Sequence, residues 1–403
     1  MSRLIARLLA LALLAACSPD PVASDDPAPR SEAPLFERAF VIQDVVLFDG
    51  LSDTPLPGQS VLVVGDRIAA IGPRGTLELP SHAEIVPGEG HFLMPGLIDA
   101  HTHITHWGDD ALVKLVDAGV TTARDMGGDL DAQLALRDAT RRGDRLGPDL
   151  LLCGPFLEGS AAGGEHREHV DGPEQAAAAV RALVERGVDF LKVQPKIESE
   201  VVRAIVAQAA ALDRVAVGHV PAGLSPQQAV ELGLKSVEHV ESFLSLDDAA
   251  LDTTFAAFRA HDAWLTPALF GMQAALEARG ADPDSDAQLA RARQVVARAH
   301  AAGVPLLVGS NFAFRDWPQQ PGSGLHGELR ALVDAGLPAA DVLRMATHGA
   351  ACFLGREREF GSLRVGLRAD MLLLHANPLE DIANSASLHY IVMRGFLFGP
   401  RAP

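Results

Sequence analysis

The sequence predicts an α/β fold, a (β/α)8 TIM-like barrel with a small β-sandwich domain formed from both ends of the mature chain. The middle of the chain alternates short apolar stretches with longer Ala/Leu/Arg-rich stretches of helical spacing, a pattern typical of parallel βαβ units. Both ends consist instead of short Val-, Ile- and Phe-rich stretches broken by Gly, Pro and Asp turns. The length of 403 residues fits one large domain and one smaller one.

The composition allows a large core and excludes some partners. Apolar residues make up 48% of the chain and charged residues 21%, which argues against global disorder. The formal net charge is −18 at pH 7. Because a nucleic-acid backbone requires a basic patch on the protein, this charge balance argues against a nucleic-acid partner.

The first residues are typical of an export signal. Arg3 and Arg7 give a basic start, and LLALALLAA (8–16) is too short for a membrane-spanning helix, which needs about 20 residues. LAAC (14–17) resembles the bacterial lipobox, in which the signal peptide is cut before a cysteine that then carries lipid. We therefore expect a signal peptide over 1–16 and a lipidated Cys17, which would anchor the chain without a spanning helix.

Ser18 follows this cysteine, which in Gram-negative lipoproteins usually goes with the outer membrane, so we expect an exported chain facing the periplasm. The alternative is an ordinary signal peptide with Cys17 incidental. Residues 17–38 are rich in Pro, Asp, Ser and Ala without apolar periodicity, which predicts a disordered tether after the lipidated cysteine. Cys153 and Cys352 lack CxxC spacing and are expected to be free thiols, with a disulfide as the alternative in an exported protein.

The mature chain divides into three segments by the type of element they predict. We assign 39–93 to the N-terminal part of the β-sandwich, 94–357 to the barrel and 358–403 to the C-terminal part of the β-sandwich. The strand-rich stretches at the two ends are AFVIQDVVLFDG (39–50), QSVLVVGDRIAAIG (59–72), AEIVPGEGHFLMPG (83–96), GSLRVGLRADMLLLHANP (361–378) and LHYIVMRGFLFG (388–399).

Eight strand candidates lie in the middle of the chain, as a barrel of typically about 250 residues requires. They cover 96–104, 120–126, 149–159, 188–194, 214–220, 235–240, 263–270 and 303–311. Helix candidates between them include 173–187, 198–213 and 287–303. A doubly wound open sheet is the structural alternative, but no GxGxxG loop follows the first strand.

Polar residues end several of these strands, where barrel enzymes place their chemistry. His101 and His103 are two residues apart on one strand, so both imidazoles point the same way and suit one metal ion. Alone, an HxH pair, a strand-end lysine or a single histidine is more often ordinary structure. The order of the set favours a metal site: His101 and His103 on the first strand, then Lys192, His219 and His239 ending the fourth, fifth and sixth, with Asn311 ending the eighth.

These stretches resemble the metal-dependent amidohydrolase superfamily, in its imidazolonepropionase-like and prolidase-like branch, whose members hydrolyse amide bonds of dipeptides and cyclic amides. The resemblance extends from about residue 39 to residue 398. It is carried by MPGLIDAHTHI (94–104), VDFLKVQ (188–194), VAVGHVPAG (215–223), KSVEHVESF (235–243), the late helices over 325–355 and the returning strands over 361–382.

The resemblance implies two divalent metal ions, with zinc as the first choice. His101 and His103 would bind the more buried ion and His219 and His239 the more exposed one. Lys192 would be carboxylated and bridge them, because a carbamate is an anion with two oxygens whereas an ammonium is a cation. The two ions would share a hydroxide that attacks the amide carbonyl.

One position departs from the family pattern. The family has Gly-Thr-Asp after the eighth strand, where this chain has Gly309-Ser310-Asn311. An amide cannot accept a proton near neutral pH, so general-base help worth about 10²–10⁴-fold would be lost. Three interpretations remain open: a hydrolase relying on the hydroxide alone, another base from the following loop such as Asp316 or His326, or a metal-bearing but catalytically silent binding lipoprotein.

Two loops at the predicted rim offer substrate contacts. The Gly-rich stretch 158–170 carries His166 and His169, and the stretch 312–326 carries Arg315, which suits a substrate carboxylate, and His326. For each, a solvated loop residue or a surface ion pair is the plainer interpretation. We predict a metal-dependent hydrolase of C–N amide bonds in a small substrate, a dipeptide or a cyclic amide. The chain would meet the membrane only through its lipid anchor, with a homo-oligomer as an open possibility.

Overall fold

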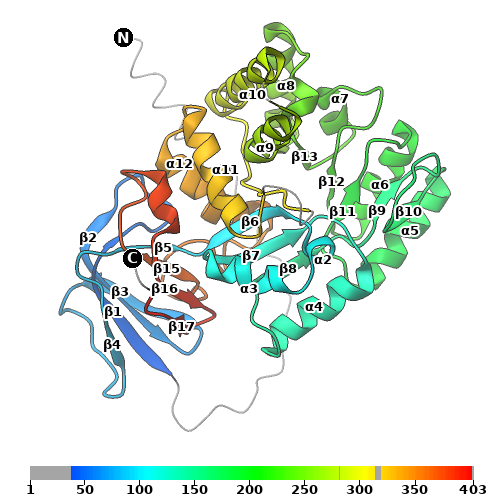
Figure 1. Ribbon diagram of the computed structural model, residues 1–403. Coiled ribbons are helices and arrows are strands. Elements are labelled where there is room, and N and C mark those ends of the chain that lie inside the picture. Colours follow the sequence, from blue (N-terminus) through cyan, green and yellow to red (C-terminus); the bar gives the residue numbers. More distant parts are fainter. Residues whose placement is uncertain (1–37, 281, 314–318, 402–403) are drawn as a thin grey trace.

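The computed structural model describes residues 38–280, 282–313 and 319–401. The predicted signal peptide, Cys17, and the loop residues Arg315 and Asp316 lie outside the described residues. Figure 1 shows two parts side by side: a sheet of blue and red strands, and a set of cyan and green strands surrounded by helices. The first part therefore combines the two ends of the described chain, and the second part holds its middle.

Strands from both ends form one mixed eight-stranded sheet. β15 pairs antiparallel with β5, so the C-terminal strands extend the sheet that the N-terminal strands begin. Alternate residues such as Phe40, Ile42, Val61 and Val63 share one buried apolar cluster, as the period of two in a strand requires. The packing of this sheet as a sandwich stays a prediction. The strands are β1 (Ala39–Leu47), β2 (Leu56–Val64), β3 (Arg67–Pro73), β4 (Glu84–Pro87), β5 (Phe92–Pro95), β15 (Met371–Leu374), β16 (Leu388–Met393) and β17 (Phe396–Phe398).

The middle of the chain has a TIM-barrel-like α/β fold built on parallel strands. Seven of the predicted barrel strands form, and the stretch 149–159 makes two short strands in place of one, with Gly154 and Pro155 between them. One sheet has the order β6-β7-β8 and the other the order β10-β9-β11-β12-β13-β14. The strands are β6 (Leu97–Thr102), β7 (Val120–Asp125), β8 (Asp149–Leu152), β9 (Phe156–Glu158), β10 (Arg167–His169), β11 (Leu191–Val193), β12 (Ala216–Gly218), β13 (Ser236–Glu238) and β14 (Trp264–Thr266).

The stretch 303–311, predicted as the eighth strand, forms only an isolated bridge between Leu306 and Leu265. Pro305 lacks the N–H that a regular ladder would use, which explains part of this difference. The stretch still runs between β14 and β6, because the N–H of Leu307 donates to the carbonyl of Leu265 at 2.9 Å and the N–H of Ala100 donates to the carbonyl of Val308 at 2.9 Å. On the opposite side, the N–H of Asp189 donates to the carbonyl of Leu152 at 2.7 Å, so backbone hydrogen bonds connect the two parallel sheets at both places.

The helices surround the parallel strands and bury one apolar face each against them (Figure 1). Several begin at a residue suited to cap them: Asp129, Ser225, Asp247 and Asp282 each accept a backbone N–H of the first turn. The α-helices are α2 (Ile104–Trp107), α3 (Asp110–Asp117), α4 (Leu130–Arg142), α5 (Pro173–Glu185), α6 (Ser199–Ala211), α7 (Pro226–Glu231), α8 (Asp248–Ala260), α9 (Leu269–Arg279), α10 (Pro283–Ala301), α11 (Ser323–Asp334), α12 (Ala339–Arg344) and α13 (Ala350–Phe353). Two short 3-10 helices, η2 (Val240–Phe243) and η4 (Ile382–Ala386), and one π-helical turn, η3 (Met345–Gly349), complete the set.

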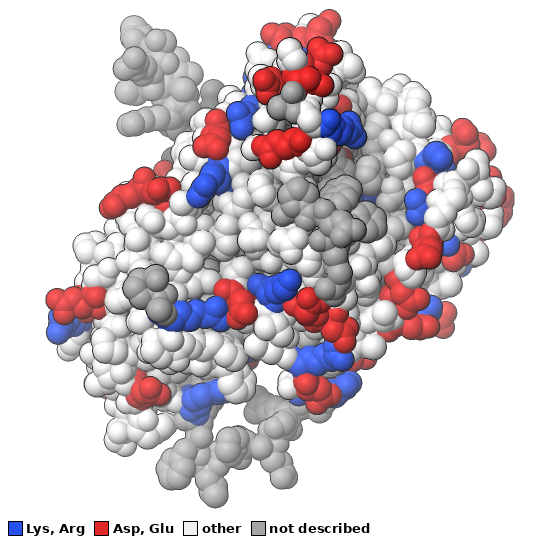
Figure 2. Space-filling view, viewed as in Figure 1, with Lys and Arg blue, Asp and Glu red and all other residues white. Residues whose placement is uncertain are grey.

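The surface charge, the length of the helices and the state of the cysteines complete the description. Figure 2 shows acidic and basic side chains interspersed over the face in view. Within the described ranges, no helix is both long and apolar enough to cross a membrane. Neither Cys153 nor Cys352 forms a disulfide in this part of the chain, in agreement with the expectation from their spacing.

Candidate metal centre

Five residues predicted from strand ends converge at one place in the parallel sheets. We call them the histidine–lysine cluster: His101, His103, Lys192, His219 and His239. The imidazole centroids follow one another at 5.3 Å from His103 to His101, 5.0 Å from His101 to His239, and 4.8 Å from His239 to His219. Lys192 lies on β11 and is close enough to all four rings to lower their pKa. The prediction that these side chains share one site is consistent with this geometry.

The backbone is shaped to bring these side chains together. Gly218, which precedes His219, has a φ of +148°, and a Cβ on it would lie 2.1 Å from the carbonyl oxygen of Val193. Glycine therefore lets β12 approach β11 closely. His239 has a φ of 72° directly after β13, in the left-handed region that non-glycine residues rarely adopt. Such conformations concentrate at sites where a side chain must be aimed in a particular direction.

Several polar atoms of the cluster are buried without a hydrogen-bond partner among the described residues. They are Nε2 of His101, Nζ of Lys192 and Nδ1 of His219. Leaving a buried polar atom unpaired costs about 1–3 kcal/mol each, so such atoms in a native site call for an external partner. Imidazole nitrogens with free lone pairs are the donors that a divalent transition metal prefers, so the donor set of the cluster fits metal ions of this kind.

Burial keeps the imidazoles neutral, as metal ligation requires. Desolvation, followed by the nearby Lys192 charge, lowers the pKa of His103 to about 3 and that of His239 to about 4. The same causes lower the pKa of His101 and His219 well below the usual value. Desolvation also lowers the pKa of the Lys192 amine to about 8. A larger share of this amine is therefore neutral near pH 7 than for an exposed lysine, and only a neutral amine can react with CO₂.

A buried carboxylate that the sequence did not single out orients His101. Oε2 of Glu238 lies 2.8 Å from Nδ1 of His101, which directs the other ring nitrogen into the cluster. Oε1 of Glu238 accepts hydrogen bonds from Arg124 at 2.9 Å and from Ser236 at 2.5 Å. Although burial alone would raise it, Arg124 and His101 hold the pKa of Glu238 well below its usual range. A glutamate at the end of a predicted strand, directly before His239, was the signal in the sequence.

Asn311 lies beside His101, as the barrel prediction requires. Its φ is 51°, and its N–H donates to the carbonyl of His101 at 2.8 Å. The preceding Ser310 donates its hydroxyl to Asp99 at 2.6 Å, which fixes this segment against β6. Gly309 has no room for a side chain, because a Cβ there would lie 2.5 Å from the Cβ of His101.

Gln319 is a second residue that sequence reasoning missed. Its side chain is fully buried, and neither amide atom has a hydrogen-bond partner among the residues that the structure describes. A Cβ placed on Gly271 would lie 2.6 Å from Nε2 of Gln319 and 3.7 Å from Nδ2 of Asn311, so both amides face the start of α9. No pattern in the sequence distinguishes Gln319 from other loop glutamines.

The predicted rim residues have different surroundings. The ring of His166 lies 5.4 Å from that of His106, which lies 5.5 Å from that of His103, so His166 is connected to the cluster through one intervening ring. His169 is half-buried on β10, with Nδ1 at 3.3 Å from the carbonyl oxygen of Gly159.

His326 has partners on both ring nitrogens. Nδ1 lies 2.8 Å from the Ser385 hydroxyl, and Nε2 lies 3.0 Å from the carbonyl oxygen of Ala118. These partners lie on η4 and after α3, so the contacts favour an anchoring role for His326 over the predicted contact with substrate. The other candidates on this loop, Arg315 and Asp316, lie outside the described residues.

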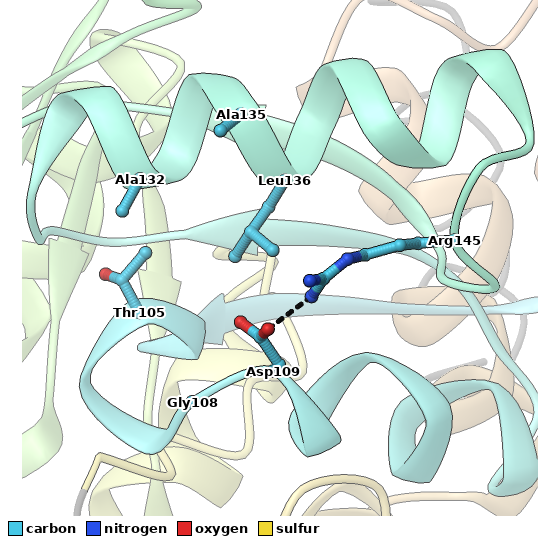
Figure 3. Close-up of a pocket in the computed structure, with 7 residues that line it drawn as sticks. All are labelled: Thr105, Gly108, Asp109, Ala132, Ala135, Leu136 and Arg145. Carbon is cyan, nitrogen blue, oxygen red and sulfur yellow. Dashed lines mark ion pairs between the residues drawn. The ribbon is translucent and has the colours of Figure 1, made fainter.

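A cavity of about 380 Å³ opens beside α2, between α3 and α4 (Figure 3). Asp109 and Arg145 form an ion pair across it at 2.5 Å. None of the predicted site residues lines it, although Thr105 lies between His103 and His106 in the sequence. The cavity therefore adjoins the cluster without containing it.

The fold and the cluster define a class of protein, a TIM-barrel-like α/β protein with a histidine-rich cluster at the strand ends. Residues 92–395 match the model of the amidohydrolase family, and the chain belongs to this family. It is 30% identical to an imidazolonepropionase of Rubrobacter xylanophilus, over 80% of this chain and 86% of that protein. It is 25% identical to an ochratoxinase of Aspergillus niger, over 80% of this chain and 78% of that protein. A prolidase solved with N-methylphosphonate-L-proline matches with a TM-score of 0.76 at 25% identity, over 90% of this chain and all of that chain.

Proposed function

We propose that this protein is a metal-dependent hydrolase of C–N amide bonds in small substrates. The observation that carries the proposal is the convergence of buried His101 and Lys192 with the half-buried His103, His219 and His239, a set in which three nitrogens lack partners among the described residues. The family and its imidazolonepropionase and prolidase relatives support hydrolysis of C–N bonds. We further propose that the two parallel sheets close into a barrel through the stretch 303–311, which would place the cluster at its mouth.

The donor set suits two divalent ions, with zinc as the first choice. His101 and His103 would hold one ion, His219 and His239 the other, and Lys192 as a carbamate would bridge them. Bound there, two ions would supply an activated water and polarise the scissile carbonyl. No three of the cluster's histidines bring ligand nitrogens within 4.8 Å of one another, which agrees with ligands divided between two ions.

The chain's own residues prepare this centre before any ligand arrives. Burial keeps the four imidazoles unprotonated, so that their lone pairs are available at neutral pH. Glu238 fixes the tautomer and direction of His101, and Arg124 stabilises the Glu238 charge that does so. The lowered pKa of Lys192 favours the neutral amine from which a carbamate forms.

Asn311 decides how efficient the hydrolysis is. Its position beside His101 is the one where the family has an aspartate that takes and returns a proton. An amide oxygen can position a water or a substrate N–H but cannot accept a proton near neutral pH. We therefore propose turnover that depends on the metal-activated water alone, about 10²–10⁴-fold below that of the same centre with a base.

The relatives point to the substrate class. The branch of the family that the sequence resembles hydrolyses dipeptides and cyclic amides, and a prolidase and an imidazolonepropionase are among the similar proteins, so we propose one of these two kinds of small amide for this protein. We also propose that the chain is exported and tethered by Cys17 to the outer membrane, facing the periplasm. The proposed substrate class starts from the resemblance to the amidohydrolase family, and the proposed anchor starts from the resemblance of LAAC (14–17) to the lipobox.

The test is metal content together with turnover on a panel of dipeptides and cyclic amides, for the wild type and for Asn311→Asp. We expect two ions per chain, slow turnover in the wild type and faster turnover in Asn311→Asp. Asn384→Asp, the same change on η4, serves as the matched control and should leave turnover unaltered. Metal-free protein with no turnover in either form would contradict the proposal.

A catalytically silent binding protein is the second candidate, and the observation that favours it is again Asn311. It predicts two bound metal ions and affinity for a dipeptide without hydrolysis. Activity that appears only in Asn311→Asp would support this candidate, whereas turnover by the wild type would exclude it.

A further inference from the structure

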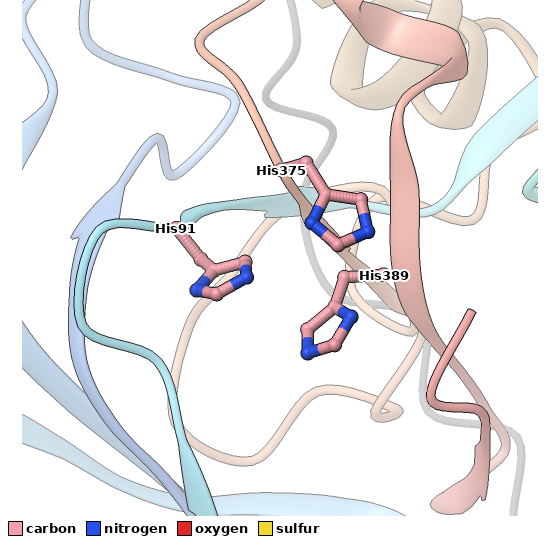
Figure 4. Close-up of side chains that lie close together, drawn as sticks. All are labelled: His91, His375 and His389. Carbon is pink, nitrogen blue, oxygen red and sulfur yellow. The ribbon is translucent and has the colours of Figure 1, made fainter. Parts of the chain in front are cut away.

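Three half-buried histidines meet where β5, β15 and β16 of the eight-stranded sheet lie side by side (Figure 4). We call them the sheet histidines: His91, His375 and His389. One possible ligand nitrogen from each lies within 4.8 Å of one from each of the other two. The ring centroids lie 4.5 Å apart for His91 and His389, 4.6 Å for His375 and His389, and 5.4 Å for His91 and His375.

The strand register explains why residues so far apart in sequence meet. Phe92 of β5 pairs with Leu374 of β15, which pairs with Leu388 of β16. The sheet histidines are the immediate neighbours of these three residues, so they lie at one level across adjacent strands. The pairing of β15 with β16 moves from Leu373–Tyr390 to Leu374–Leu388, which leaves His389 as the extra residue of a bulge. A bulge turns a side chain away from the alternation of the strand, and here it lets His389 face the other two rings.

Each sheet histidine has one ring nitrogen on a backbone carbonyl oxygen. Nδ1 of His91 lies 3.1 Å from the carbonyl of Glu89, Nε2 of His375 lies 3.1 Å from that of Arg401, and Nδ1 of His389 lies 3.3 Å from the same Arg401 carbonyl. A carbonyl accepts only, so these nitrogens carry the protons of the neutral rings. The lone pairs then fall on Nε2 of His91, Nδ1 of His375 and Nε2 of His389.

We propose that these three nitrogens bind one divalent transition-metal ion, with zinc as the probe ion. Neutral imidazoles held in one tautomer by a carbonyl are the usual arrangement of histidine ligands, and three of them leave one position for water. A tetrahedral ion with Zn–N bonds of about 2.0–2.1 Å places its nitrogens about 3.3 Å apart. One nitrogen from each ring already lies within 4.8 Å of one from each of the other two, so small rotations of the rings would complete the site.

This site shares no residue with the histidine–lysine cluster and does not depend on the proposed hydrolysis. It would connect β5 to β15 and β16, the places where the N-terminal and C-terminal parts of the sheet join. The carbonyl that holds two of the three rings belongs to Arg401, whose guanidinium donates at 2.7 Å to Asp117, the last residue of α3. Binding of an ion would therefore stabilise the end of the described chain against both parts of the molecule.

The test counts zinc per chain after chelation and dialysis against zinc, in the wild type and in the double variant His375→Gln/His389→Gln. We expect the double variant to bind one ion fewer than the wild type and to lose part of the zinc-dependent rise in the thermal midpoint. His261→Gln, an exposed histidine after α8, is the matched control and should behave as the wild type. Equal zinc content in the wild type and the double variant would overturn the proposal.

A second measurement covers the case in which the double variant does not fold. Crystals of the wild type grown with zinc should show an anomalous scattering peak at the zinc edge between the sheet histidines. The single variant His91→Gln, which changes a residue outside a strand, should lack that peak while peaks elsewhere persist. A map with no peak between the three rings would overturn the proposal, whatever the metal content of the histidine–lysine cluster.

Discussion

Glu238→Gln tests whether the carboxylate that touches His101 controls the proposed metal centre. The Glu238 carboxylate accepts from three donors, His101, Arg124 and Ser236, and its side chain is fully buried. Glutamine keeps the shape but offers one acceptor oxygen and one NH₂ group, so at least one donor would face another donor. If the NH₂ group faces His101, the ring must accept at Nδ1 and carry its proton on Nε2, the atom that points into the cluster.

The magnitude follows from these contacts. Losing the partner that orients a histidine ligand typically costs 10–100-fold in metal affinity, which is about 1.4–2.8 kcal/mol. Arg124 would also lose its compensating charge while its side chain stays about 1% exposed. Breaking a buried ion pair by removing one partner costs about 3–5 kcal/mol, so the metal-free variant should be less stable than the wild type by this order.

Metal affinity by competition with a coloured chelator and thermal unfolding of the metal-free protein measure the two effects separately. Glu231→Gln on α7, where the glutamate is exposed, is the matched control and should change neither. Metal affinity within about twofold of the wild type, together with an unchanged thermal midpoint, would refute the role given to Glu238.

Three further predictions concern packing, pH and the lipid anchor. Gly309→Ala should displace His101 and lower metal content with a loss of about 1–3 kcal/mol of stability, whereas Gly163→Ala, where a Cβ meets nothing within 4 Å, should do neither. Burial raises the pKa of the Glu328 carboxyl to about 7 in the folded protein. The contribution of the protonated carboxyl to stability is therefore full below pH 4.5 and is lost as the pH rises through 7. Denaturant unfolding of the metal-free wild type should show a loss of about 3 kcal/mol relative to Glu328→Gln over that interval. Equal slopes for the two proteins would contradict this assignment. Cys17→Ser should abolish incorporation of labelled fatty acid and release the protein from membranes, and labelling that persists would exclude Cys17 as the anchor.

The sequence by itself determined the class of fold and the residues of the cluster. Seven of the eight barrel strands predicted from the apolar patterns form, because these patterns reflect burial of one face of each element. The order of His101, His103, Lys192, His219 and His239 predicted a shared site, because parallel strands bring their carboxyl ends to one edge. The sequence also revealed that Asn311 departs from the family pattern, because the family has an aspartate at the end of the eighth strand.

Only the tertiary structure revealed the contacts between residues distant in sequence. Glu238 contacts and orients His101, although the two residues are 137 positions apart in the sequence. His389 comes close to His91 because of a bulge in β16 that no local sequence pattern predicts. The stretch 303–311 makes a bridge in place of a regular strand, because its partners on β14 and β6 decide its hydrogen bonds. Local patterns record which side of an element is buried, whereas the identity of the atoms that meet there depends on register and on the packing of the whole chain.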